Sequence, residues 1–266
     1  MANLDGETSD PALAGVYGKN TGQGGVGVAG VSSSGDGVRA VSTSGNGVSA
    51  FSDSGVAAYA KANGQPGVVG ISASSDGVRA VSTSGNGLSA FSTSGTGLFA
   101  QGTPNAAYFQ GTVVVTGDIQ LVEGAGDLAE EFDLDHHAVA EPGTVMVFGD
   151  GAGLRPATEA YDCRVAGVVT GAGRYRPGLV LDRQSDIPTG IPKQDRGTVA
   201  LVGKVYCKVD ADPAPIRVGD LLTTSATQGH AQKAVHRDAA FGAVLGKAMG
   251  SLASGQGLIP ILVTLQ

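Results

Sequence analysis

The sequence contains no tryptophan, few other aromatic residues and little charge. Aromatic residues make up 5% and charged residues 15% of its 266 residues, so few large side chains are available to anchor a core. No apolar run reaches the ~18 residues that a membrane-spanning helix needs, and no basic start followed by an apolar segment marks a secretory signal near Met1. We therefore expect no membrane insertion and synthesis in the cytoplasm without a signal peptide.

The charge balance is acidic, with a net charge of −7 and a sequence pI near 5.0. Because nucleic-acid-binding domains carry basic surfaces, this balance predicts no nucleic-acid partner. Hydrophobic residues still make up 41% of the chain, which is too many for a disordered tail.

The two cysteines, Cys163 and Cys207, are too few for a disulfide scaffold, and their spacing does not fit a zinc site. Two interpretations remain open. Both residues are small buried thiols on β-strands, or they form one disulfide between neighbouring strands.

Glycine is abundant, with 44 residues, and marks a repeat in the first hundred positions. It never falls at every third position, which excludes a collagen triple helix. The segment Gly37–Gly55, GVRAVSTSGNGVSAFSDSG, returns almost unchanged as Gly77–Gly95, GVRAVSTSGNGLSAFSTSG. A glycine followed by an aliphatic residue recurs at spacings of 8 to 12, which gives a unit of about ten residues within a higher repeat of forty. The alternating apolar residues and the Ser-Gly turns predict short strands instead of helices.

The residues that would face inward in this repeat are small, so any core that they build is narrow. A single-chain β-solenoid would hold only a few coils in this length. Three chains wound about one axis would each supply one side of every layer, and nine units at ~4.8 Å would extend ~40 Å. We expect the intertwined trimer and keep the single-chain solenoid as the alternative.

The segment GVGVAG, Gly25–Gly30, matches the pattern G-x-G-x-x-G of dinucleotide-binding proteins. That site requires a preceding strand and a following helix. Here the glycines belong to a serial repeat that no helical pattern follows, so we expect no cofactor.

The repeat closes with AAYFQGTVVVTGDI, Ala106–Ile119. In this pattern the sequence resembles the distal fibres and appendages of tailed bacteriophages, in which a Gly/Ser-rich repeat leads into a C-terminal β domain. The resemblance implies a homotrimer with a mechanical or adhesive role in a virion or extracellular appendage. The β-branched run 112–122, TVVVTGDIQLV, itself predicts a hairpin or a strand-turn-strand junction.

The changes in composition divide the chain into four parts. We predict an N-terminal segment, 1–14, a β stalk of ten-residue repeats, 15–105, a junction with an acidic connector, 106–141, and a C-terminal β head, 142–266.

The head should be all β, a compact antiparallel barrel or sandwich. We expect a hairpin about Asp150-Gly151, a final strand fixed in the sheet, and a short helix near Asp127–Leu134, DLAEEFDL. This half resembles the C-terminal domains of phage neck appendages, which act as trimerisation chaperones and in some members cleave themselves. No self-cleavage motif matches residue by residue.

The acidic connector contains a candidate metal site in Asp133, Asp135, His136 and His137. Adjacent histidines on a strand point to opposite faces, so one ion cannot easily bind both. We interpret the segment as a solvated connector and expect no metal.

Catalytic residues are hard to assemble from this sequence. The nucleophile elbow G-x-S-x-G is absent. His230 and His236 are candidate bases with Asp220 or Asp238 as orienting groups. A glycosidase pair could be drawn from the acidic residues Glu130, Glu131, Asp133 or Asp135, although adjacent carboxylates in a connector are usually solvated. The resemblance to phage stalks implies the alternative function, a polysaccharide-degrading enzyme.

Basic residues gather on either side of a proline-containing loop at 181–197. On an acidic protein these residues are candidates for binding an acidic partner, either a cell-surface glycan or another appendage protein. In the other interpretation they bridge strands or subunits to carboxylates such as Asp182 and Asp186. The candidate partner-binding residues are Arg174, Tyr175, Arg176, Arg183 and Arg196.

Taken together, these patterns predict a non-enzymatic structural subunit of a trimeric fibre. The stalk would give length and stiffness. Because a shift by one repeat preserves most stalk contacts, the non-repetitive head would fix the register of the three chains and bind a partner or receptor.

Overall fold

The computed structural model describes residues 16–22, 24–122, 124–135, 138, 140–151, 153–183 and 195–264. The chain divides into two compact units, Met1–Tyr108 and Phe109–Gln266. Strands account for 28% of the residues and helix for 2%, so the protein is nearly all β, as predicted. Among the described residues no helix is long and apolar enough to cross a bilayer.

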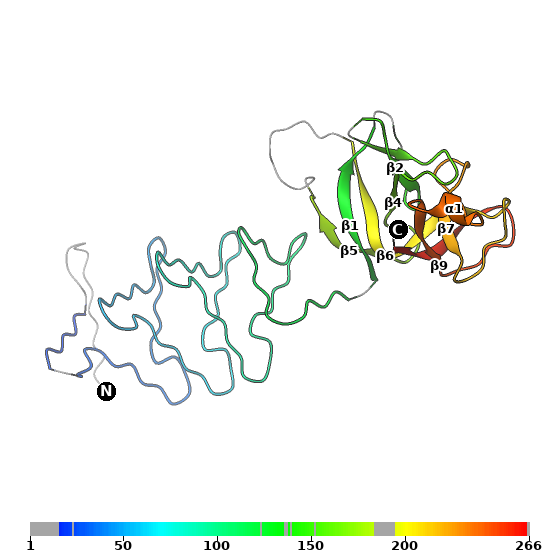
Figure 1. Cartoon of the computed structure of the whole chain (residues 1–266). Coiled ribbons are helices and arrows are strands. Elements are labelled where there is room, and N and C mark those ends of the chain that lie inside the picture. Colours follow the sequence, from blue (N-terminus) through cyan, green and yellow to red (C-terminus); the bar gives the residue numbers. More distant parts are fainter. Residues whose placement is uncertain are drawn as a thin grey trace. The chain divides into compact units, whose positions relative to one another are not determined.

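The N-terminal unit repeats one local conformation at a uniform period of ten residues. From 31 to 100 every unit bends at its third, fourth, fifth and seventh positions, and Figure 1 shows this part as successive similar loops. Six turns are closed by a serine hydroxyl that accepts the backbone N–H three residues on, at 2.9 to 3.0 Å. These serines are Ser32, Ser42, Ser52, Ser72, Ser82 and Ser92.

The uniform period corrects the spacings of 8 and 12 on the two sides of Gly55 in the sequence pattern. Gly55, which set those spacings, lies at the fifth position of its unit, and Ala57 takes the seventh position that Gly47 and Gly67 hold in the neighbouring units. An alanine fits there because a Cβ added to Gly47 or Gly67 would lie 3.6 Å from the nearest carbonyl oxygen, which is ordinary contact.

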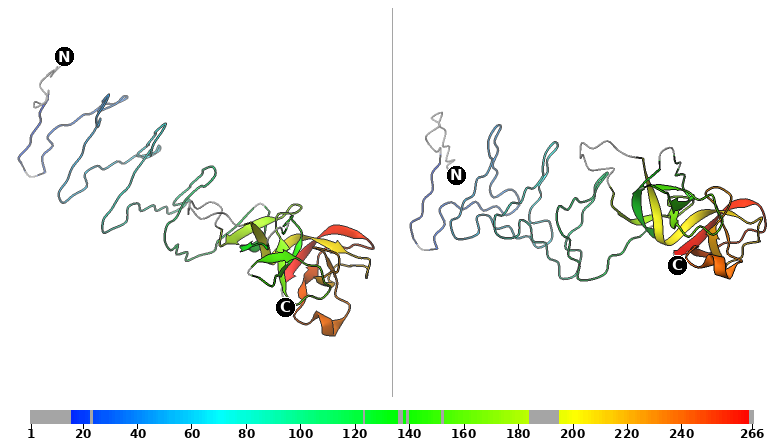
Figure 2. Two further views of the ribbon diagram at one scale, coloured as in Figure 1. Left: turned by 90° about the horizontal axis from the view of Figure 1, so that it is seen from above. Right: turned by 45° about the horizontal axis from the view of Figure 1, so that its top comes forward.

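The predicted strands of the repeat do not form within one chain. The described residues of 16–122 contain no strand and no helix, and each of them is exposed. They make one backbone–backbone hydrogen bond, from Gly25 N to Gly22 O at 3.3 Å. Each unit bends back on itself in a short loop (Figure 2). Residues seven apart come close, since a Cβ added to Gly37 would lie 2.8 Å from the carbonyl oxygen of Gly30, but these approaches form no ladder of backbone hydrogen bonds among the described residues.

The C-terminal unit is built around a closed five-stranded barrel. In order around the barrel the strands are β6, β8, β7, β9 and β10, and β10 pairs back onto β6 to close it. Their bounds are Arg196–Asp210 for β6, Ala231–Lys233 for β8, Leu221–Thr224 for β7, Val244–Ala248 for β9 and Gln256–Thr264 for β10.

Five further strands extend the sheet from the first half of β6, with β1 and β4 on its two opposite edges. The first half of β6 pairs with both β1 and β4, β5 pairs with β1, and β2 links β4 to β3. Most pairings are antiparallel, as expected, but β1–β5 and β6–β8 are parallel. The bounds are Ala125–Asp133 for β1, Val145–Phe148 for β2, Leu154–Pro156 for β3, Val165–Val169 for β4 and Arg176–Leu181 for β5, with one short helix, α1, Arg237–Ala240.

The barrel core consists of small and medium aliphatic side chains. The alternate residues Val205, Cys207 and Val209 of β6 point inward and pack against Ile259 and Ile261 of β10. A second cluster lies under β1 to β4 and includes Met146 and Leu154. No tryptophan is needed because the short strands and the small residues make a narrow core.

Several sequence-based predictions can now be checked. The hairpin about Asp150-Gly151 is confirmed as β2–β3, and the final strand is confirmed in the sheet as β10. The helix predicted near Asp127–Leu134 is wrong, because this segment is mostly strand β1, and its Asp127 and Glu131 are buried instead of solvated. The junction predicted as strand-turn-strand at 112–122 forms no strand in the single chain.

The two cysteines are free thiols and do not form a disulfide. Cys207 is buried on β6, as one of the two interpretations expected, and burial raises the pKa of its thiol. Cys163 is exposed because it lies in the turn before β4 and not on a strand, so the expectation of a buried thiol is wrong there.

Candidate interaction surface of the head

A cluster of basic and aromatic side chains lies at the start of β5. The guanidinium of Arg174 and the ammonium of Lys204 each lie 5.3 Å from the centroid of the Tyr175 ring. The Tyr175 and Tyr206 rings are tilted, with centroids 5.5 Å apart. Cations over an aromatic face are attracted by the ring quadrupole. We call Arg174, Tyr175, Lys204 and Tyr206 the basic–aromatic cluster.

The strand register explains how these residues meet. Lys204 and Tyr206 alternate on the outer face of β6, opposite Leu262 and Pro260 of β10. Lys204 and Arg174 are exposed and the two tyrosines are half-buried, so the cluster presents positive charge on a partly apolar base. Such a surface suits an acidic partner, and the prediction that Arg174 and Tyr175 bind one stays a prediction.

Arg176 has a role within its own chain. Its Nη1 donates to the carbonyl oxygens of Gly171, Gly173 and Tyr175 at 3.1 to 3.3 Å. These bonds hold the turn that carries Arg174 and Tyr175, although the Arg176 residue itself is exposed. Whether it also contacts a partner stays a prediction.

Arg196, at the start of β6, is the centre of a second network. Its Nη1 donates to Asp133 Oδ1 at 3.0 Å, and its Nη2 donates to Asp182 Oδ2 at 2.6 Å and to the carbonyl oxygen of Glu131 at 2.5 Å. The guanidinium is 17% exposed. The Asp182 ion pair confirms the bridging interpretation, which joins the end of β5 to β1 and β6, whereas Asp186 lies outside the described residues.

Arg183 lies beside the same network. Its Nε is 3.9 Å from Glu131 Oε1, and its side chain is 56% exposed. Because Glu131 is nearly buried, Arg183 and Arg196 share the neutralisation of one interior carboxylate. This pairing explains how Glu131 can lie on the inner face of β1, although the sequence pattern predicted that it is solvated.

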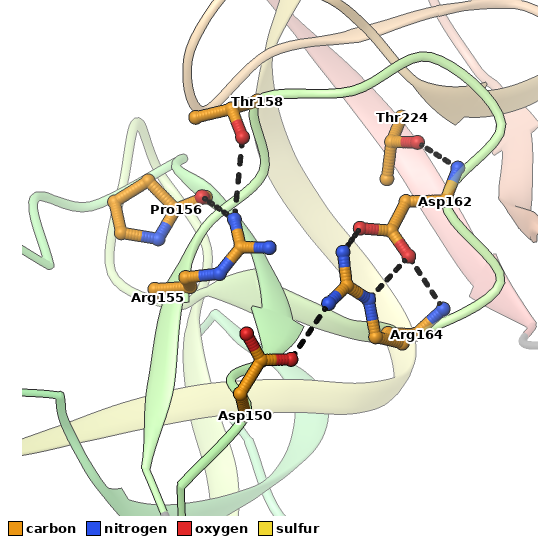
Figure 3. Close-up of polar contacts among 7 residues, drawn as sticks. All are labelled: Asp150, Arg155, Pro156, Thr158, Asp162, Arg164 and Thr224. Atoms are coloured by element: carbon orange, nitrogen blue, oxygen red, sulfur yellow. Dashed lines mark hydrogen bonds and ion pairs between the residues drawn. The ribbon is translucent and has the colours of Figure 1, made fainter.

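A third network closes the turn before β4. Asp162 Oδ1 accepts from Arg164 Nε at 2.9 Å, Oδ2 accepts from Nη2 at 2.8 Å, and Asp162 N donates to Thr224 Oγ1 at 2.8 Å (Figure 3). The hydrogen bonds from Arg164 lower the pKa of Asp162. Neighbouring Tyr161 has φ 59°, and its hydroxyl accepts from Val235 N and His236 N. These contacts fasten the 157–164 turn to the barrel, which is a structural role.

Several of the candidate catalytic groups are engaged in other contacts. Asp220 accepts from Lys233 and from Arg217 N, and His236 lies against the Tyr161 ring. On β1 the adjacent Glu130 and Glu131 point to opposite faces, so they cannot flank one glycosidic bond.

The candidate metal ligands are also engaged or lie outside the described residues. Asp133 pairs with Arg196, and the side chain of Asp135 lies against Gly149 and Gly153. His136 and His137 are outside the described residues. In the remaining described chain, no group of three His, Cys, Asp or Glu residues is arranged to hold an ion.

Comparison with known proteins gives few matches. No family model and no curated protein matches the sequence. One similar solved structure is the C-terminal fragment of bacteriophage phi29 gene product 12, 16% identical, covering 52% of this chain and 100% of the fragment, with a TM-score of 0.37. TM-scores this low do not establish a shared fold.

Two further solved structures belong to the same phage. Pre-mature gene product 12 is 16% identical, covers 55% of this chain and 23% of that protein, and has a TM-score of 0.39. The N base of the head fibre gp8.5 is 13% identical, covers 51% of this chain and 94% of that one, and has a TM-score of 0.29.

Proposed function

We propose that the protein is a non-enzymatic structural subunit of a homotrimeric, phage-type fibre or appendage. The observation that carries this proposal is the repeat unit, which exposes the same apolar positions every ten residues in a single chain. Two positions of the unit supply them. They include Val38, Val48, Val68, Val78, Leu88 and Leu98 at the eighth position, and Val41, Phe51, Ile71, Val81 and Phe91 at the first.

An isolated stalk chain has no evident source of stability. It buries no described side chain between 16 and 122 and makes almost no backbone hydrogen bonds there, yet its ordering costs ~1–2 kcal/mol per residue in backbone entropy. Packing against further chains would both cover the apolar positions and pair the free backbone groups.

Copies of the same chain are the partners that fit this surface. The exposed apolar residues recur at one fixed period, so a partner must offer complementary residues at that same period, and this chain does so. The small residues beside them, such as Ala40, Ala50 and Ala60 at the tenth position, suit a slim core shared by three chains. A narrow shared core favours three chains over a wider assembly.

The first test is the solution mass of the intact protein, measured by light scattering after size-exclusion chromatography over a range of concentrations. We expect three times the chain mass of 26.3 kDa. A mass of one chain at all concentrations would contradict the proposal and favour a single-chain solenoid.

A pair of matched variants tests the role of the apolar positions. Val41→Asp with Val81→Asp places charge at equivalent apolar positions of the two near-identical repeats. Thr43→Asp with Thr83→Asp places the same charge two residues away, in the exposed turns. We expect the valine variant to lower the mass and the threonine variant to leave it unchanged. Equal behaviour of the two would mean that the apolar positions do not hold the chains together.

A further inference from the structure

A row of aliphatic side chains crosses the outer face of three neighbouring strands of the head. Leu128 of β1 is paired with Leu179 of β5 on one side and with Val202 of β6 on the other. Paired residues in a sheet project from the same face. Leu179 is 52% and Val202 is 54% exposed, whereas Ala129, the next residue along β1, is fully buried. We call Leu179, Leu128 and Val202 the aliphatic row.

Opposite charges lie on the two sides of the row. Glu130 follows Leu128 by two residues on the same face of β1 and is half-buried, with the buried Val199 as its partner on β6. Lys204 follows Val202 by two residues on the outer face of β6 and is exposed. Because β1 and β6 run antiparallel, Glu130 and Lys204 lie on opposite sides of the row. In the part of the chain that the structure describes, Glu130 makes no ion pair. The surface is therefore acidic at one end, aliphatic in the middle, and basic and aromatic at the other end.

The chain leads into this surface through exposed apolar residues. Ile119, Leu121 and Val122 are all exposed, and β1 begins at Ala125. Leu121 also lies near β5, since its Cδ1 is 3.4 Å from a Cβ added to Gly178. Strand β1, which carries the middle of the aliphatic row, thus directly follows a segment of exposed apolar side chains.

We propose that the aliphatic row is the surface through which the head of one copy contacts the head of the next copy in the trimer. This inference rests on the trimeric fibre proposed above. Three joined stalks would hold three β1 strands at high effective concentration, so a small apolar contact suffices. The acidic and basic ends suit a head-to-tail ring, in which Glu130 of one copy faces Lys204 of the next.

The test uses tryptophan as a burial probe, because the natural chain has none. Val202→Trp and Leu179→Trp each place one indole in the row, at side chains that are already half exposed and so do not disturb the core. Val218→Trp is the matched control, since Val218 is 67% exposed and lies outside these three strands. We expect blue-shifted emission and several-fold weaker acrylamide quenching at positions 202 and 179 than at 218.

The mass measurement distinguishes failure of the head contact from failure of the trimeric fibre. Solvent-like emission at both row positions, in a protein with the mass of three chains, would overturn the head contact and leave the fibre proposal standing. A mass of one chain for the natural protein would overturn both proposals.

The head-to-tail order is tested by exchanging the charges in the Val202→Trp background. Glu130→Lys and Lys204→Glu should each shift the emission toward that of exposed tryptophan, because each places like charges together. The double exchange should restore the buried signal. If neither single exchange changed the tryptophan emission, the proposed head-to-tail order of the copies would be overturned.

Discussion

Arg164 binds both carboxylate oxygens of Asp162, with Nε 2.9 Å from Oδ1 and Nη2 2.8 Å from Oδ2. The side chain of Asp162 is almost wholly buried, whereas that of Arg164 is about one-third exposed. The pair therefore keeps an interior carboxylate hydrogen-bonded, and the turn that leads into β4 depends on it.

Asp162→Asn should lower the free energy of unfolding of the head by about 2 kcal/mol, because it removes a charge-assisted, bidentate hydrogen bond. Urea unfolding followed by circular dichroism measures the change. The control is Asp150→Asn, which removes the other carboxylate near Arg164. The side chain of Asp150 is 98% exposed. We expect an effect below ~0.5 kcal/mol there, and equal losses in the two variants would contradict the importance of the buried pair.

The Asp162 contribution should disappear in acid. The hydrogen bonds from Arg164 lower the pKa of Asp162 in the folded state. A depressed folded-state pKa gives stability that is complete above the unfolded-state pKa of ~3.9 and is lost as the pH falls through the folded-state value. The difference in unfolding free energy between the natural protein and Asp162→Asn should shrink below about pH 4. A constant difference down to the acid limit would refute the assignment.

The contribution of Asp127 to stability should change with pH in the opposite direction. Burial raises its pKa, and the hydrogen bond from Thr170 only partly offsets this. The folded state then binds the proton more tightly than the unfolded state, so stability falls as the pH rises from the unfolded-state pKa of ~3.9 through the raised value. Relative to the natural protein, Asp127→Asn should therefore gain stability between about pH 4 and pH 7. Thermal unfolding at both pH values measures this, and a pH-independent difference would contradict it.

The serine turns of the stalk offer a paired test in both directions. Ser42→Ala removes one hydroxyl that accepts a backbone N–H at 2.9 Å. Ala62→Ser adds a hydroxyl in the unit that has alanine at this position. We expect Ser42→Ala to lower and Ala62→Ser to raise the stability of the stalk by about 0.5 kcal/mol per chain. Calorimetry on the intact protein measures both, and shifts of the same sign would show that the turns do not depend on this bond.

Tyr161→Phe should weaken the attachment of the 157–164 turn. The Tyr161 hydroxyl accepts from Val235 N at 2.9 Å and from His236 N at 3.1 Å, and both donors would lose their partner. Because water can reach these exposed residues, we expect a loss of about 1 kcal/mol in the unfolding free energy. Tyr175→Phe is the control, since among the described residues its hydroxyl accepts one hydrogen bond, from the exposed Arg174 at 3.3 Å. A larger effect at Tyr175 would be contrary to this account.

The strands of the head were predictable where turn residues bound an apolar run, as at Asp150-Gly151 between β2 and β3. Strand β1 was not, because its sequence, AGDLAEEFD, is acidic and reads as a helix or a solvated connector. The partners of its buried carboxylates come from far along the chain. Thr170, 43 residues from Asp127, donates to one oxygen of that carboxylate. Arg196 forms an ion pair with the carboxylate of Glu131 and lies 65 residues away. No local pattern contains these partners.

The candidate interaction surface was likewise only partly predictable, because it depends on contacts between residues far apart in the sequence. Arg174 and Arg176 were singled out by their charge and Tyr175 by its place between them, and the Arg196–Asp182 bridge was anticipated because the two flank one loop. Lys204 and Tyr206 were missed, although their alternation on a long strand was visible in the sequence. Only the pairing register places them beside Tyr175, and it also aligns Leu128 with Leu179 and Val202.

Because every unit has ten residues, the length of the repeat segment is set by the number of units. Segments 37–55 and 77–95 are near-copies forty residues apart, so unequal recombination between their coding sequences would add or remove four whole units at once. Every remaining unit would keep the same neighbours. The number of units can therefore change in steps of four while the sequence of the C-terminal unit stays unchanged.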